Sequence, residues 1–356
     1  MVRVPSSHGG SREFESLPAH HSKKPMKPPV SRRLCLQERT LVGAPLSVKI
    51  NGAMKSGISK IPRQLIIKLG KLLGLILYCL AIPHRRLVQR NLRFCYPEWP
   101  TKEIRELSRR IFMNFGINLV EMFQATFMSS EEVLHMCRLE GEDNFINLIK
   151  ENRGLVVVSA HMGNWEVGLH FTNAYGKPML GVAAKTRYSW ADILLRSSRN
   201  RLGNLIIDKK GALPKMTEAL RRGEVVGMLM DQSRRKHGVE VTFFGRKATA
   251  SPAAALLALR CKSLVLPAFC VRRPDGELTI QVKEPIEMTR TGDLRRDIQN
   301  NTQRMIDVVE EMVRKYPDQW FWLLKPWKVH YPELYSDWDA RRRKRKAKKK
   351  QKALAK

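Results

Sequence analysis

The chain has 356 residues, 43% of them hydrophobic, so it is long and apolar enough for one large α/β domain with a substantial core. Its 65 Lys and Arg against 33 Asp and Glu give a formal net charge of +32, which indicates anionic partners such as lipid head groups, nucleic acid or an acidic protein. The six cysteines are scattered without a C-x-x-C pair. This pattern argues against a zinc site of the usual spacing and against a disulfide framework, and it is typical of a reducing compartment.

The N-terminal part divides into a polar extension and an apolar segment. Residues 1–53 are rich in Pro, Ser, Lys and Arg, and we expect them to be a disordered basic extension. Residues 65–82 are the most apolar stretch of the chain and are close to the ~17-residue minimum for a membrane helix, although Lys68 and Lys71 interrupt them. We interpret residues 54–83 as a membrane-anchoring helix, either a short span or a helix lying in the interface. A buried core helix of a soluble protein is the alternative.

The next segments predict helices at 101–122 and 130–136, and from residue 155 onward strand and helix patterns alternate. The expected strands are 155–159, 178–184, 205–208, 225–230, 264–272 and 278–283. The expected helices are 164–174, 191–202, 213–222, 252–261 and 293–315. The alternation predicts an α/β fold with a mostly parallel central sheet flanked by helices, and the turn sequence P-D-G at 274–276 predicts an antiparallel hairpin at one side. The main folded domain is expected at 84–335, followed by a disordered basic tail at 336–356.

A histidine follows the first strand of this alternation. The apolar run 155–158 leads into Ser159, and His161 comes where a buried strand would emerge, with Glu166 five residues later. A carboxylate on one imidazole nitrogen fixes the tautomer, and the other nitrogen can then take a proton from a hydroxyl. Because no G-x-S-x-G elbow surrounds Ser159, the pair predicts direct attack by a substrate hydroxyl on an activated acyl group. From spacing alone, a helix-capping histidine with a solvated glutamate is the alternative.

Residues 159–166, S-A-H-M-G-N-W-E, resemble the H-x(4)-[DE] motif of the lysophospholipid acyltransferase superfamily. The N-W-E form after an apolar strand resembles the bacterial lipid A biosynthesis (lauroyl/myristoyl) acyltransferase family. Further matches follow in family order: Arg187, R-N-R-L-G at 199–203, G-E-V-V at 223–226, M-D-Q at 230–232, F-F-G at 243–245 with Ala248, and Gln319 with Trp322 and Leu323. The C-terminal block departs from the family at 324–326, L-K-P, where paired arginines are common. The acceptor is therefore less well determined than the reaction.

The resemblance implies a lysophospholipid-acyltransferase-like fold and the transfer of a fatty acyl chain from acyl carrier protein to a hydroxyl of a lipid A precursor, in late secondary acylation of lipopolysaccharide biosynthesis. It makes His161 the general base and Glu166 its partner. It implies no cofactor and no metal, with acyl-ACP as co-substrate and acyl-CoA as the alternative donor. The implied partners are acyl carrier protein, an anionic glycolipid acceptor and the membrane, without nucleic acid. The implied location is the cell inner membrane, with the catalytic domain on the cytoplasmic side.

The resemblance also suggests substrate-binding residues. Asn164, or backbone N–H groups at the helix start, would stabilise the oxyanion. Arg187 and Arg201 suit the phosphate or carboxylate groups of an anionic glycolipid, because a guanidinium binds such groups in a bidentate manner. Asp231 would orient one of these arginines or contact substrate. The alternatives are a surface salt bridge for either arginine and a plain strand-end cap for Asp231. The phenylalanines at 243–244 would line an acyl groove, with core packing as the alternative.

Two other kinds of function remain open. The first is an acyltransferase of the same superfamily that acts on a glycerophospholipid, an ornithine lipid or an inositol mannoside. The second is a different class of protein, either a basic nucleic-acid-binding protein or a non-catalytic membrane scaffold. The basic part of the tail, residues 341–356, lacks aromatic residues and matches no nucleic-acid-reading module, which argues against nucleic-acid binding.

Overall fold

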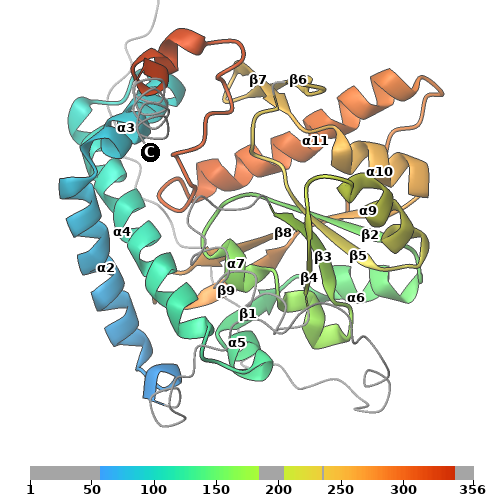
Figure 1. Ribbon diagram of the computed structural model, residues 1–356, viewed down its shortest axis with the longest axis horizontal. Coiled ribbons are helices and arrows are strands. Elements are labelled where there is room, and N and C mark those ends of the chain that lie inside the picture. Colours follow the sequence, from blue (N-terminus) through green and yellow to red (C-terminus); the bar gives the residue numbers. More distant parts are fainter. Residues whose placement is uncertain (1–56, 184–203, 235, 341–356) are drawn as a thin grey trace, which may run out of the picture.

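The computed structural model describes residues 57–183, 204–234 and 236–340 (Figure 1). Outside these ranges lie the predicted extension 1–53, the predicted helix 191–202, the two arginines at 187 and 201, and residues 341–356 of the predicted tail.

A seven-stranded sheet forms the centre of the molecule, in the order β1-β9-β8-β2-β5-β3-β4. All neighbouring pairs are parallel except β8 and β9, which form the predicted antiparallel hairpin. The strands are β1 (Cys137–Glu140), β2 (Leu155–Ser159), β3 (Met179–Ala183), β4 (Leu205–Asp208), β5 (Val225–Leu229), β8 (Leu264–Arg272) and β9 (Leu278–Val282). The predicted mostly parallel sheet is therefore confirmed.

Helices cover both faces of the sheet, and the side chains of β2 show why its sequence is apolar throughout. Val156 and Val158 belong to the core shared with the helices of one face, which are α9 (Ala212–Arg221), α10 (Ala253–Cys261) and α11 (Leu294–Lys315). Leu155 and Val157 belong to the core on the other face, shared with α5 (Ser130–His135), α6 (Glu142–Lys150), α7 (Trp165–Gly168) and the 3-10 helix η1 (Phe171–Tyr175). Because successive residues of a strand point to opposite faces, a strand buried between two helical layers is apolar at every position.

Several features differ from the sequence-based expectation. Helix α3 (Ile82–Cys95) was not predicted, and residues 336–340, expected in the disordered tail, are helical. The predicted helix at 164–174 is divided into α7 and η1, and the break follows Gly168, a residue of low helix propensity. Strand β1 and helix α6 were not predicted, because each is short and only partly apolar. A two-stranded antiparallel hairpin, β6 (Val239–Phe243) and β7 (Arg246–Ala250), was also missed, although V-E-V-T-F alternates as a half-buried strand does.

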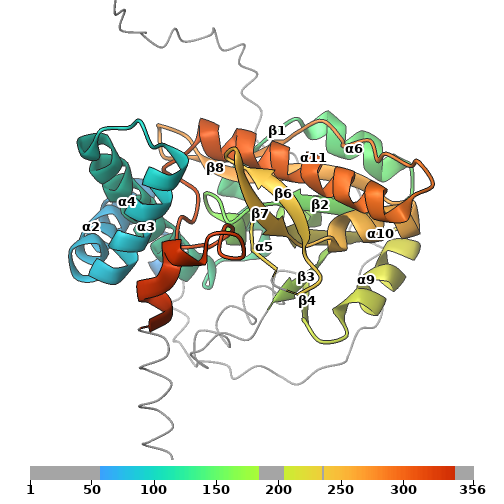
Figure 2. The same cartoon turned by 90° about the horizontal axis from the view of Figure 1, so that it is seen from above.

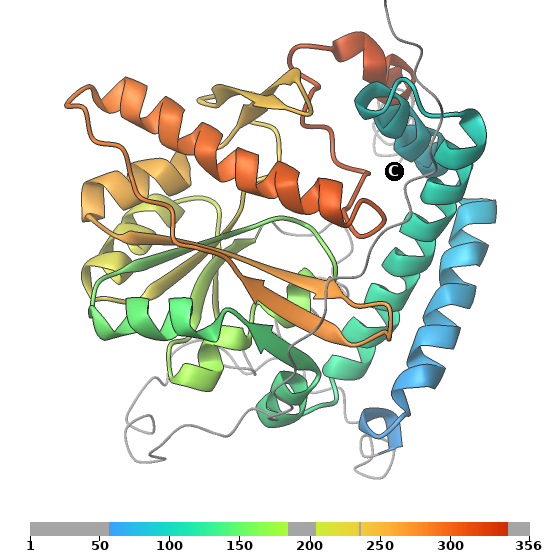
Figure 3. The same cartoon turned by 180° about the vertical axis from the view of Figure 1, so that it is seen from behind.

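The predicted anchor segment forms helix α2 (Arg63–Leu80), which packs against α4 (Thr101–Ala125) at one flank of the sheet (Figures 1 and 3). Glycines make this contact possible. A β-carbon on Gly116 would lie 2.3 Å from the carbonyl oxygen of Gly70, and one on Gly74 would lie 2.3 Å from that of Phe112. The two helices therefore touch backbone to backbone, and larger side chains would separate them.

The opposite face of α2 is apolar and exposed. Its large side chains are between 44% and 75% exposed and recur every three or four residues, at Leu65, Leu69, Leu72, Ile76 and Leu80. Within the described residues, no helix alone has the length and hydropathy to cross a bilayer. Helices α2 and α3 (Ile82–Cys95) meet those criteria only as a pair, and they are bent by 93° where they join. The anchoring role of residues 54–83 therefore stays a prediction.

We expect Gly116→Ala to destabilise the fold by about 1–3 kcal/mol, because the new methyl group would overlap the backbone of α2. The free energy of unfolding in urea measures the change. Gly57→Ala is the matched control, since a β-carbon there meets nothing within 4 Å. Equal stability of the two variants would show that α2 and α4 are not in backbone contact.

Candidate active site

His161 and Asp231 meet where two neighbouring parallel strands end. In the register of β2 and β5, Ser159 lies opposite Leu229, and each of the two polar residues follows its strand by two positions. Nδ1 of His161 lies 2.7 Å from Oδ1 of Asp231, and the backbone N–H of His161 donates to Oδ2 at 2.7 Å. Because an ionised carboxylate can only accept, Nδ1 carries the proton and Nε2 is left with its lone pair.

Asp231 is buried and accepts a further hydrogen bond from a tryptophan. The indole Nε1 of Trp320 donates to Oδ2 of Asp231 at 2.8 Å, and the Asp231 side chain is 0% exposed. Burial raises the pKa of Asp231, but the neighbouring His161 and the hydrogen bonds from His161 and Trp320 outweigh it, so that the pKa lies below its ordinary value. The carboxylate of Asp231 therefore holds His161, and the substrate-binding role predicted for Asp231 stays a prediction.

The other side of the imidazole faces a polar group and two aromatic rings. The side-chain amide nitrogen of Gln232 lies 3.2 Å from Nε2. The ring of Trp165 meets the imidazole edge-on at 5.3 Å between centroids, and that of Phe321 lies at 6.3 Å. The His161 side chain is 14% exposed. With Nδ1 occupied by a buried carboxylate, Nε2 is the nitrogen that can take a proton from an incoming hydroxyl.

Glu166 occupies the first turn of α7, where its Oε1 accepts a hydrogen bond from the indole Nε1 of Trp165 at 3.1 Å. It thereby supports the ring that packs against His161. The carboxylate on Nδ1, whose partner fixes the tautomer, is that of Asp231 and not that of Glu166. The catalytic role of Glu166 stays a prediction.

The side chain of Asn164 has a structural role. It is 2% exposed, its Oδ1 accepts from the backbone N–H of Val167 as the N-cap of α7, and its Nδ2 donates to Glu121 at 2.7 Å. Both ends of the amide are thus used within the protein. The oxyanion role expected for Asn164, and the alternative of backbone N–H groups at the helix start, both stay predictions.

The loop that carries His161 is held by the C-terminal segment. The backbone N–H of Gly163 donates to the carbonyl of Gln319 at 2.9 Å, and that of Phe321 donates to the carbonyl of His161 at 2.8 Å. Gly163 has φ +49°, and a β-carbon there would lie 1.9 Å from the carbonyl oxygen of Cys270. This position therefore requires glycine, both for its backbone conformation and for the close approach of β8.

A buried ionic network holds the same loop from the α4 side. The carboxylate of Glu121 is 0% exposed and pairs with both terminal nitrogens of Arg272, and Arg63 at the start of α2 lies 2.6 Å from it. Asn118 bridges Arg272 and the carbonyl of Gly163. Burial raises the pKa of Glu121, but Arg272, Arg63 and the hydrogen bond from Asn164 outweigh it and leave the pKa below its ordinary value.

Sequence reasoning missed this network and also Trp320, since Glu121, Arg272 and Asn118 lie on segments far from His161 in the chain. The only available signal was the presence of single charged residues at apolar positions of α4 and β8. The proposed acyl groove is also corrected: Phe243 and Phe244 are buried among Trp320, Trp322 and Trp327, so the core-packing alternative holds.

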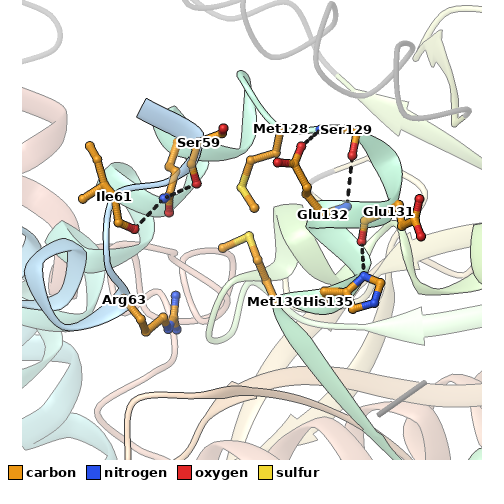
Figure 4. Close-up of a pocket in the computed structure, with 10 residues that line it drawn as sticks. Ser59, Ile61, Arg63, Met128, Ser129, Glu131, Glu132, His135 and Met136 are labelled. Carbon is orange, nitrogen blue, oxygen red and sulfur yellow. Dashed lines mark hydrogen bonds between the residues drawn. The ribbon is translucent and has the colours of Figure 1, made fainter. Parts of the chain in front are cut away.

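A cavity of about 560 Å³ lies between the start of α2, the end of α4, and α5 (Figure 4). Its lining includes Arg63 of α2 and, from α5, Glu131, Glu132 and His135. His161 is not among its lining residues. Across the described part of the chain, no three His, Cys, Asp or Glu side chains are grouped closely enough to hold a metal ion.

We expect Glu121→Gln to lower the free energy of unfolding by about 3–5 kcal/mol at neutral pH, because it leaves Arg272 buried without its counter-charge. Since the pKa of Glu121 is below its ordinary value, the stability that its charge contributes is complete above about pH 4.3 and is lost as the pH falls further. Urea unfolding at neutral and acid pH should show that the free energies of unfolding of wild type and Glu121→Gln become equal in acid.

Glu106→Gln, in an exposed pair on the same helix, is the control and should have little effect. A constant difference at all pH values would contradict this assignment.

Comparison with known proteins gives the family. A family model described as bacterial lipid A biosynthesis acyltransferase matches residues 50–329. The lipid A biosynthesis lauroyltransferase of Escherichia coli K12 is 26% identical over 76% of this chain and 88% of its own length. The lipid A biosynthesis myristoyltransferase of the same organism is 23% identical over 79% and 86%.

Two more distant matches were also found. The phosphatidylinositol mannoside acyltransferase of Mycolicibacterium smegmatis is 24% identical over 67% of this chain and 78% of its own length. The crystal structure of a 1-acyl-sn-glycerophosphate acyltransferase from Thermotoga maritima aligns over 70% of this chain and 97% of its own, at 13% identity and a TM-score of 0.31, which is too weak a similarity to support an inference. The match of the family model over most of the sequence is decisive: this chain is an acyltransferase that belongs to the bacterial lipid A biosynthesis acyltransferase family.

Proposed function

We propose that the protein transfers a fatty acyl chain from the thioester of acyl carrier protein to a hydroxyl of a lipid A precursor, as a late secondary acylation of lipopolysaccharide biosynthesis. The observation that carries this proposal is the pair of His161 and buried Asp231 in a member of this family. Its geometry supports a general base whose Nε2 faces the substrate side.

In the proposed reaction, Nε2 of His161 takes the proton of the acceptor hydroxyl as its oxygen attacks the thioester carbonyl carbon. Asp231 stabilises the imidazolium that forms, without itself becoming protonated. When the tetrahedral intermediate collapses, the carbon–sulfur bond breaks and the imidazolium returns the proton to the leaving thiolate. Before substrate arrives, the amide of Gln232 occupies the position near Nε2 that the hydroxyl would take.

Acceptor, donor and location are inferred from charge and family. Net charge +32 suits an anionic glycolipid and an acidic carrier protein, and lipid A acyltransferase is the description of most of the relatives found. Another lipid acceptor is the second candidate, because a relative acting on phosphatidylinositol mannoside was also found. For Arg187 and Arg201, binding of the acceptor's anionic groups remains a proposal from sequence.

Membrane attachment is proposed to use α2. Its glycine face is occupied by α4, whereas its apolar outer face is exposed. Lys68 and Lys71 of the same helix are also exposed. A helix with these properties fits one that lies in the membrane interface, with lysines reaching the head groups. This placement would bring the catalytic domain to the cytoplasmic surface of the inner membrane.

The function is tested by mass spectrometry of lipid A from a strain that lacks the gene. We expect lipid A without one secondary acyl chain, full acylation when the wild-type gene is restored, and no recovery with His161→Ala, because no base remains for the hydroxyl. Immunoblotting verifies that the variant accumulates. Unchanged lipid A with an altered phospholipid or other lipid would instead support the second candidate.

Substitution of the two carboxylates separates their roles. Asp231→Asn should lower kcat by about 10²–10⁴, because an amide in place of the carboxylate no longer fixes the tautomer or stabilises the imidazolium. Glu166→Gln should cost less, since its amide oxygen can still accept from Trp165. Acyl transfer in detergent micelles, with thermal unfolding to verify folding, measures both. A larger loss in Glu166→Gln than in Asp231→Asn would return the partner role to Glu166.

A further inference from the structure

The described chain ends beside the corner where α2 meets α3. The last segment, from the 3-10 helix η2 (Pro332–Tyr335) to residue 340, lies against α3 (Figures 1 and 2). The carboxylate of Asp337 pairs with Arg90 of α3 at 2.5 and 2.9 Å, and the ring of Trp338 lies 5.1 Å from that of His84 in the first turn of α3. These contacts hold the last described residues, up to residue 340, against α3.

That corner is apolar and is bordered by basic residues. Leu80, the last residue of α2, is 75% exposed, and Ile82, the first residue of α3, is 42% exposed. Both are within four residues of His84, which contacts Trp338. Arg86 and Arg93 of α3 are exposed on the same helix. The end of the exposed apolar face of α2 therefore lies close to the last described residues of the chain.

The sequence that follows residue 340 is R-R-R-K-R-K-A-K-K-K-Q-K-A-L-A-K, with eleven basic residues and no acidic one. We propose that residues 341–356 bind the head groups of an anionic bilayer on which the outer face of α2 lies, as a second membrane contact. The inference rests on the membrane location proposed for this protein, and it deepens that proposal by assigning the tail a role.

The physical basis of the proposal is that a single contact binds a protein to a bilayer only weakly. An interfacial helix or a single lipid chain binds a bilayer reversibly, and stable attachment needs a second signal such as a polybasic segment. Each Lys or Arg close to an anionic surface adds to the binding, and the attraction decays within a Debye length, about 10 Å at 0.1 M salt. A basic segment can contribute only if it starts near the surface. Residue 340 meets this condition, because it follows the segment held against α3 beside Leu80 and Ile82.

The composition of the segment favours lipid over nucleic acid. It contains no aromatic residue that could stack on a base. Leu80 and Ile82, each within four residues of the His84 that contacts Trp338, are exposed apolar side chains that suit the acyl region of a bilayer. An acidic protein would be attracted by the same charge but would not need the apolar corner. An anionic bilayer is the one partner that engages both features.

The test uses the full chain with every Lys and Arg of 341–356 replaced by Gln, beside wild type and a variant with the same sixteen residues in scrambled order. Co-sedimentation is measured with neutral phosphatidylcholine vesicles and with vesicles containing about 30% phosphatidylglycerol at about 0.1 M salt. We expect the Gln variant to bind the anionic vesicles at least tenfold more weakly than wild type, and neutral vesicles to within twofold. The scrambled variant should match wild type, because head-group attraction depends on charge and not on order.

Further measurements separate this proposal from its rivals and from the proposed function. Raising the salt to about 0.5 M should remove the difference between wild type and the Gln variant, and acyl transfer in detergent micelles should be equal in both. Equal binding of wild type and the Gln variant to anionic vesicles would overturn the proposal. A raised KM for acyl carrier protein or a lost affinity for duplex DNA, with vesicle binding unchanged, would assign the tail to those partners. Absence of acyl transfer in wild type would refute the proposed function alone.

Discussion

The parallel pairing of β2 with β5 is the constraint on which the site depends. It sets Ser159 opposite Leu229, so that His161 and Asp231, each two residues past its strand, arrive at the same edge of the sheet. Both strands are apolar and flanked by helices on both faces, which makes the pairing rigid. A rigid pair of strands positions an imidazole against a buried carboxylate more precisely than a flexible loop would.

The loop that follows β2 gains its conformation from segments distant in the sequence. Gln319 and Phe321 hold its backbone from one side, and Asn118 holds the carbonyl of Gly163 from α4. Glu121 holds Asn164, which caps the helix bearing Trp165 and Glu166. A buried carboxylate between two arginines is costly to desolvate, and removal of one partner is strongly destabilising because it leaves the other charge buried and unpaired. Here it links α2, α4 and β8 to the residues beside the base.

Helix α2 has two faces with different requirements. Gly70 and Gly74 let it approach α4 so closely that Arg63, its first residue, reaches Glu121. The other face is apolar and exposed along the whole helix. The same helix thus completes the network behind the loop that carries His161 and presents the surface proposed to meet the bilayer. The proposed membrane contact and the hydrogen-bonded network of the site thus involve the same helix.

The sequence by itself predicted six of the seven strands of a mostly parallel sheet, most of its helices, a histidine after β2 and the family. These depend on local signals: apolar runs, periodicity and a contiguous motif. It did not determine which carboxylate holds His161. Glu166 is near in sequence, whereas Asp231 becomes a neighbour only through the order of the strands, which no local pattern specifies. Asn164 was assigned to substrate for the same reason, since its partner Glu121 lies 43 positions away. Tertiary structure decided the roles of polar groups, because a buried polar side chain takes its function from whichever partner the fold brings to it.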